Sequence, residues 1–128
     1  LSLHDALPIL FIPVQLAAIE AISGDQSCVE QTRNAYKMRR DAFLSNAKKI
    51  GWKIDKTKGT MFIWAKIPDK YSSSIDFVND LFEQTGVLFV PGKAFGTYGE
   101  GYVRIALIQD IEVIEKTFAI IAKTDIFK

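Results

Sequence analysis

The sequence is poor in the residues that build disulfide frameworks, metal centres and hydrolase triads. Its 128 residues include one cysteine, Cys28, and one histidine, His4. A single cysteine excludes an internal disulfide framework and is typical of a reducing compartment, so we expect Cys28 to be a small packing residue. A lone histidine near a terminus excludes a Ser-His-Asp triad and is given no role. No His/Cys/carboxylate cluster has metal-ligand spacing, so no metal site is predicted.

The sequence also lacks a charge excess and a long apolar run. Sixteen basic and fifteen acidic residues give a formal net charge of +1 and are spread without blocks. Nucleic-acid and acidic-membrane binders need a basic patch, so neither class is expected. No segment approaches the roughly 18 apolar residues that span a bilayer. With the lone cysteine, this favours a cytoplasmic protein, and 48% hydrophobic residues suffice for one core.

The first half of the chain is predicted to be helical. Pro13 suits a first helical turn, and Gly24 ends a short helix. Asp25 can cap a second helix from about Gln26 to Ile50. Its apolar residues form one narrow stripe: Val29, Tyr36, Phe43, Ala47 and Ile50. At about 1.5 Å per residue this helix is roughly 38 Å long, which suits a strut between two bodies.

The second half predicts an α+β domain, a small three-stranded sheet covered by helices. The apolar run 60–68 reads as a buried, well-covered strand, and the strands 87–90 and 102–107 follow. A right-handed crossover would place the third strand between the first two. Ser73 should cap a helix ending at Gly86, and Asp110 should cap the last helix. The expected buried faces of these two helices are Ile75, Val78, Leu81 and Phe82, and Ile111, Ile114, Phe118 and Ile121.

Arg104 is a charged residue within an apolar strand. Alternation along the strand puts Tyr102, Arg104 and Ala106 on the face opposite the core. A guanidinium in such a setting needs water, an internal carboxylate or a bound anion. Nearby carboxylates belong to Glu100, Asp110 and Glu112. From the residues alone, an internal ion pair and a ligand-binding role are about equally supported.

The loop before that strand is rich in glycine. Pro91 and Gly92 fit a type II turn, and a simple connection explains the glycines singly, although together they could admit a ligand. No strand-to-helix junction or G-K-[ST] follows, so phosphate binding is not expected. Phe62 and Trp64 are best explained by core packing. Lys66 and Lys93 are exposed candidates whose pKa would be too high for nucleophilic work.

Two motifs together resemble a known family. The run P-G-x-x-F-G-x-x-G-x-x-x-x-R-I-A-L and the upstream GTMFIWAKIP are similar to the C-terminal domain of pyridoxal phosphate dependent aminotransferases, class I/II, fold type I. The resemblance covers about Phe11 to Lys123. It implies that Arg104 binds the substrate α-carboxylate and that Phe62 lies in a segment at the active-site rim. It also implies interdomain helices over 11–51 and a substrate-binding domain over 52–128, after a non-matching stretch 1–10.

The resemblance further implies transfer of an amino group between an α-amino acid and a 2-oxo acid. Pyridoxal phosphate would be held mainly by a large N-terminal domain that also carries the Schiff-base lysine, which has no counterpart here. No residue of this chain is therefore assigned to catalysis or cofactor binding. We expect the fragment to be inactive alone and the whole protein to be a homodimer. The stretches IPVQLAAIEA and YKMRRD resemble the branch near aspartate and LL-diaminopimelate aminotransferases.

Two alternatives remain open. A free-standing, non-enzymatic α+β module could bind an amino acid through Arg104 without chemistry. The same domain also occurs in related pyridoxal phosphate lyases and synthases and in transcription regulators. The opening of the chain, without Met and on a mismatched stretch, favours a fragment over an independent module.

Overall fold

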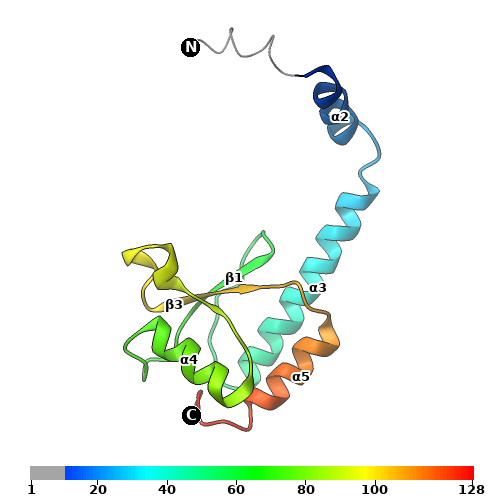
Figure 1. The fold of residues 1–128 in the computed structure, drawn as a ribbon. Coiled ribbons are helices and arrows are strands. Elements are labelled where there is room, and N and C mark those ends of the chain that lie inside the picture. The colour runs from blue at the N-terminus through cyan, green and yellow to red at the C-terminus, as the bar shows by residue number, and fades with distance from the viewer. Residues whose placement is uncertain (1–10) are drawn as a thin grey trace. The chain divides into compact units, whose positions relative to one another are not determined.

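The computed structural model describes residues 11–128 (Figure 1). The predictions for the stretch 1–10 and for His4 lie outside these residues. The chain divides into two compact units, one ending at Asn34 and one comprising Ala35–Lys128. Within residues 11–128, no helix combines the length and apolar character that crossing a membrane requires.

The first unit is helical, as predicted. Helix α2 (Ile12–Ser23) has proline in its first turn and ends where the Gly24 N–H donates to the Glu20 carbonyl at 2.8 Å. Helix α3 (Ser27–Lys49) begins after Asp25, whose Oδ1 accepts the Ser27 N–H at 3.0 Å. Cys28 is exposed, so the expectation that it packs in a core is wrong. The buried residues of α3, Phe43 and Ala47, all lie in its second half.

The sheet of the second unit has the order β1-β3-β2, which confirms the predicted central position of the last strand. Strands β1 (Phe62–Lys66) and β3 (Tyr102–Ala106) pair antiparallel over five residues, as their neighbouring arrows show in Figure 1. Strand β2 (Val90–Pro91) pairs antiparallel with β3 and is shorter than the predicted 87–90. It begins three residues later than predicted and includes Pro91, which pairs with Val103.

One face of the sheet carries the core. Val103, Ile105 and Leu107 are almost fully buried, as alternation predicted, and Ile63, Ala65 and Ile67 of the β1 segment join them. Helices α4 (Ser74–Thr85) and α5 (Ile111–Ile121) lie on the same side of the sheet in Figure 1. Each large apolar side chain buried here stabilises the fold by about 1.5 to 3 kcal/mol. The core includes an aromatic cluster: Phe43, Trp52, Phe77, Phe89 and Phe118.

The ends of α4 follow the sequence closely. The Ser73 hydroxyl accepts the Asp76 N–H at 3.1 Å, and Gly86 ends the helix at φ 71°. Its predicted buried face is partly wrong, because Ile75 and Phe82 are about half exposed while Phe77 is buried. The sheet contacts a narrower strip of the helix than its apolar residues could cover.

Helix α5 starts where predicted, but Asp110 does not cap it through its side chain. The carboxylate instead accepts a hydrogen bond from Arg39 Nη2 at 2.7 Å. Ile114, Phe118 and Ile121 are buried, whereas Ile111 is half-buried. The Asp110 carboxylate therefore binds Arg39 of α3 and does not accept a backbone N–H of the first turn of α5.

The strand around Phe62 is not the doubly covered strand that its apolar run predicted. It lies at the edge of the sheet, and its second face carries the partly exposed Trp64. A strand that is buried on one face only usually alternates apolar and polar residues, and this strand has apolar residues on both faces. This second face leads to the candidate site.

Candidate functional site

The open face of the sheet gathers aromatic side chains around Arg104. The register pairs Trp64 with Arg104 and Lys66 with Tyr102 across β1 and β3, and it pairs Val90 with Arg104 on the other side. Arg104 thus lies on the central strand, flanked by both neighbours. Its side chain points away from the core face, as the alternation of β3 predicted.

Arg104 forms no ion pair or hydrogen bond with any residue in the range 11–128. The three candidate carboxylates are engaged elsewhere. Glu100 accepts the N–H groups of Ser74 and Gly101 at 2.6 and 2.9 Å. Asp110 pairs with Arg39, and Glu112 pairs with Lys116 at 2.6 Å. Within the described residues, Arg104 therefore does not form the internal ion pair that the sequence offered as one explanation.

The guanidinium of Arg104 lies against aromatic rings. Its Cζ is 4.5 Å from the ring centroid of Phe62 and 4.7 Å from that of Phe95. The Nε atom is buried without a hydrogen-bond partner, whereas Nη1 and Nη2 reach the surface. Since an anion can approach only the accessible nitrogens, this arrangement offers the terminal fork of the guanidinium to a carboxylate.

Trp64 continues the aromatic surface. Its ring stacks on Tyr102 with centroids 5.7 Å apart and an interplanar angle of 18°, and it meets Phe95 edge-on at 5.7 Å. Core packing was the favoured explanation of Phe62 and Trp64, and it is wrong for both. Phe62 is half-buried against Arg104, and Trp64 is 39% exposed.

The glycine loop brings Phe95 to this face. Strand β2 leads into two short 3-10 turns, η2 (Gly92–Phe95) and η3 (Thr97–Gly99). Gly92 is not among the residues with positive φ, so the predicted type II turn is wrong. A Cβ on Gly92 would lie 2.0 Å from the Gly99 carbonyl oxygen, and the converse distance is also 2.0 Å. The close approach of the two backbones explains the glycines at positions 92 and 99, and the positive φ of 108° explains the glycine at position 96.

Glu100 fastens this loop to α4, a role that the sequence did not indicate. The Glu100 carboxylate accepts the N–H groups of Ser74 and Gly101. In addition, the hydroxyl of the fully buried Ser74 accepts the Lys93 N–H at 3.3 Å. The hydrogen bond from the Ser74 N–H is the main cause that lowers the pKa of Glu100 below its ordinary value. The signal was present only as an acidic residue within a glycine-rich loop.

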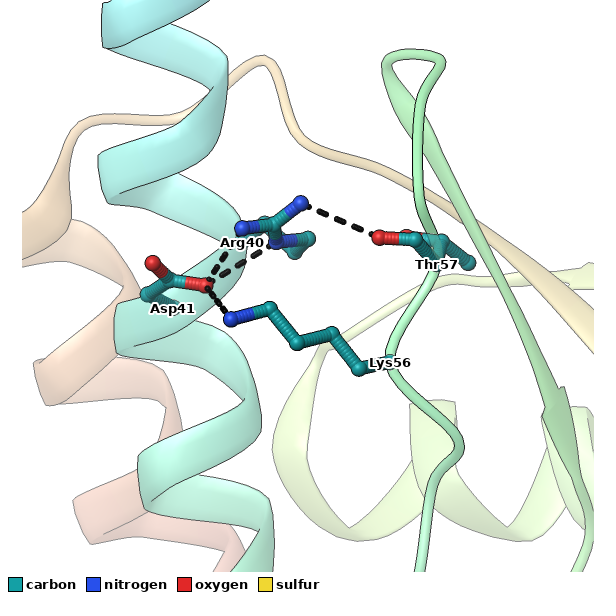
Figure 2. A network of polar contacts seen from close by, with 4 residues as sticks. All are labelled: Arg40, Asp41, Lys56 and Thr57. Atoms are coloured by element: carbon teal, nitrogen blue, oxygen red, sulfur yellow. Dashed lines mark hydrogen bonds and ion pairs between the residues drawn. The ribbon is translucent and has the colours of Figure 1, made fainter.

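A second polar network joins α3 to the segment before β1 (Figure 2). Arg40 donates from Nε and Nη2 to Asp41 Oδ1 at 2.9 and 2.8 Å and from Nη1 to the Thr57 carbonyl at 3.0 Å. Lys56 Nζ lies 3.4 Å from the same carboxylate oxygen. The hydrogen bond from Arg40 is the main cause that lowers the pKa of Asp41. The charged groups of this network pair with one another, which indicates a structural role, while the Thr57 hydroxyl is buried without a hydrogen-bond partner among the described residues.

Other candidate chemistry is not supported in the described part of the chain. Residues 11–128 contain no group of three or more His, Cys, Asp or Glu side chains placed to hold a metal ion. Lys66 pairs with Asp69 at 2.7 Å, and this contact raises its pKa, the opposite of what a nucleophilic lysine needs.

Arg104 also lines a groove of 340 Å³ that Val87, Leu88, Ile108 and Val113 border.

Comparison with known proteins defines the class. The model of the family described as aminotransferase class I and II matches residues 4–119, and the chain belongs to this family. The match begins within the stretch 1–10 that the sequence motifs set apart. The predicted family and the α+β fold of its C-terminal domain are thereby confirmed.

Individual relatives are aminotransferases. An LL-diaminopimelate aminotransferase of Halothermothrix orenii is 38% identical over 117 residues, covering 91% of this chain and 30% of the relative. Glutamate-pyruvate aminotransferase AlaC of Escherichia coli is 40% identical over 108 residues, covering 83% and 26%. Apo-BacF of Bacillus subtilis is a structural neighbour with a TM-score of 0.79 and 36% identity, covering 89% and 30%. The chain thus spans at most about 30% of the length of these relatives.

Proposed function

We propose that this chain is the C-terminal, substrate-binding part of a pyridoxal phosphate dependent aminotransferase, in which Arg104 binds the α-carboxylate of the amino acid or 2-oxo acid. The observation that carries the proposal is the guanidinium of Arg104 on the central strand, which has no hydrogen-bond or ion-pair partner among residues 11–128. Each nearby carboxylate has a different partner, and the two terminal nitrogens are accessible. Membership of the family supplies the reaction class.

A carboxylate suits this site on physical grounds. The planar fork of a guanidinium matches the two oxygens of a carboxylate, and neighbouring aromatic faces reduce competition from water. Phe62 and Phe95 provide such faces at 4.5 and 4.7 Å from Cζ. In a partly desolvated site, loss of one charged partner costs about 2 to 5 kcal/mol of binding.

The described residues do not fit pyridoxal phosphate itself. The glycine loop packs against its own backbone at Gly92 and Gly99 and so leaves no cradle for a phosphate. Lys66 is paired and its pKa is raised. When bound elsewhere in the whole enzyme, the cofactor would supply the electron sink of the reaction. The part played by this chain is to bind and orient the substrate.

The proposal includes the division of the chain and its partners. Residues 11–51 would connect to a large N-terminal domain, 52–128 would form the substrate-binding domain, and two copies would form a cytoplasmic homodimer. The second half of α3 supports the connecting role, because Phe43 and Ala47 anchor it in the core of the second unit. Phe62, beside Arg104, is proposed to border the substrate.

The test compares whole-enzyme variants expressed from the complete reading frame. We expect Arg104→Ala to raise KM for an amino-acid donor by about 30-fold or more, the equivalent of at least 2 kcal/mol. Arg104→Lys should also be impaired because an ammonium cannot form the fork. Arg33→Ala is the matched control, since Arg33 is exposed and, within residues 11–128, pairs with Glu30 alone. Wild-type kinetics in Arg104→Ala would refute the assignment.

The same variants separate an enzyme from a binding module. Calorimetric titration of the 128-residue chain with L-glutamate and with pyruvate, the pair in the name of the Escherichia coli relative, gives a direct readout. An independent amino-acid-binding module would bind unaided and lose binding in Arg104→Ala. A part of an aminotransferase would show no measurable heat until joined to the rest of its site.

A further inference from the structure

Phe95 is the second aromatic ring against Arg104, and neither the sequence nor the proposed function gives it a role. Its ring centroid lies 4.7 Å from Cζ, within the range of about 6 Å in which a cation is attracted to a ring face. Phe62 lies at a similar distance but comes from β1, whereas Phe95 comes from η2. Two separate elements therefore contact one cation that has no anionic partner in the described chain.

The loop that carries Phe95 is held by backbone contact and by hydrogen bonds to α4. The backbones of Gly92 and Gly99 are in contact, so the two ends of the segment that carries Phe95 meet. Glu100 and Ser74 tie both ends of the loop to the N-terminus of α4. The ring remains half exposed, with the edge contact to Trp64 as its other aromatic neighbour. Core packing thus does not account for an aromatic residue at this position.

We propose that Phe95 is a positioning residue that fixes the Arg104 guanidinium with Nη1 and Nη2 free for the carboxylate of the substrate. This inference rests on the proposed function of Arg104. An arginine that rotates freely must be ordered when its ligand binds, and prior ordering lowers that cost. The Nε atom is buried without a hydrogen-bond partner among the described residues, so the nitrogens left for a ligand are the two at the end of the guanidinium.

The first test measures the guanidinium directly, without substrate. The chain has four arginines, Arg33, Arg39, Arg40 and Arg104, so a ¹⁵N-labelled sample gives four Nε–H signals, and Arg104→Lys identifies the fourth. Ring currents from two aromatic faces should displace the Arg104 signal from the others. Phe95→Leu should move it toward them, whereas Phe95→Tyr should leave it near its original position.

A control variant comes from the same loop. Tyr98 is fully exposed and has no contact with Arg104, so Tyr98→Leu should leave the Nε–H signal unchanged. Backbone amide signals that stay in place outside the loop show that the Phe95→Leu chain is folded. An Arg104 signal that Phe95→Leu does not move would overturn the positioning role.

The second test uses the whole enzyme. Phe95→Leu should raise KM for the amino-acid donor about five-fold with kcat nearly unchanged, because a cation–ring contact contributes to binding at about that level. Phe95→Tyr should restore KM, and Tyr98→Leu should not alter it. A purely structural role would lower kcat through loss of folded enzyme and would spare KM.

Arg104→Ala distinguishes failure of this inference from failure of the proposed function. A raised KM in Arg104→Ala with wild-type KM in Phe95→Leu would overturn the positioning role alone. Wild-type KM in both would overturn the proposed function and, with it, the positioning role. A raised KM in both, with the shifted Nε–H signal, is the expected result.

Discussion

Gly92 and Gly99 are in backbone contact: a Cβ on either would lie 2.0 Å from the carbonyl oxygen of the other. This contact closes the loop that presents Phe95 to Arg104. Neither carbonyl can move aside as the end of a flexible side chain would, because both belong to the main chain. The pair is therefore a steric requirement of the loop.

Gly99→Ala is predicted to destabilise the second unit by about 1 to 3 kcal/mol, the usual cost of overpacking. Urea unfolding followed by tryptophan fluorescence measures this change. Gly59→Ala is the matched control, since a Cβ there meets nothing within 4 Å, and its effect should stay within about 0.5 kcal/mol. Equal midpoints for the two variants would contradict the contact.

Arg40→Ala is predicted to cost about 1 to 3 kcal/mol of stability, because it removes a hydrogen bond to the Thr57 carbonyl and leaves Asp41 with Lys56 alone. The Arg40 side chain is only 13% exposed, so added salt should weaken its contribution little. Arg33→Ala, at an exposed i,i+3 pair, should cost about 0.5 kcal/mol or less. Similar losses for both arginines would show that the network of Figure 2 is no stronger than a surface pair.

Glu100 predicts a pH dependence of stability. Its pKa is lowered on folding, so it binds fewer protons in the folded chain than in the unfolded chain. Its contribution is therefore fully present above the ordinary value of 4.5 and is lost as pH falls through the lower folded pKa. In urea titrations at a series of pH values, Glu100→Gln should lose less stability below pH 4.5 than the parent chain does. Parallel curves for the two would contradict this account.

Helix capping gives a further contrast. Ser73→Ala should cost about 1 kcal/mol because it removes the acceptor of the Asp76 N–H. Asp110→Ala should cost less, since Asp110 makes no side-chain cap and its ion pair with Arg39 is largely exposed on the carboxylate side. Thermal unfolding of the two variants under the same conditions measures the difference. A greater loss in Asp110→Ala would mean that the pair with Arg39 is stronger than its exposure indicates.

Most of the features predicted correctly depend on short stretches of chain. Ser73 and Gly86 cap α4 through groups a few residues away, and the alternation of β3 decides which way Arg104 points. The order of the strands followed from the crossover rule. The helices and the central strand with its arginine were therefore within reach of sequence reasoning.

Several of the features predicted wrongly depend on contacts between distant residues. Arg39 lies 71 positions from Asp110, and no local rule indicates that it takes this carboxylate from α5. The sequence offered Glu100 as a partner of Arg104, but the backbone N–H of Ser74, 26 positions away, binds it instead. Trp64 was misplaced because a strand with apolar residues on both faces does not show which face is open.

The order β1-β3-β2 also bears on local unfolding of the sheet around Arg104. Val103 and Arg104 of β3 pair with residues of both neighbouring strands, so their amides should be among the slowest to exchange with solvent, whereas β1 and β2 can separate at their outer edges. Partial opening of an edge strand therefore leaves the backbone at Arg104 held by the other neighbour. We therefore expect the residue proposed to bind the substrate to lie in the part of the sheet that opens last.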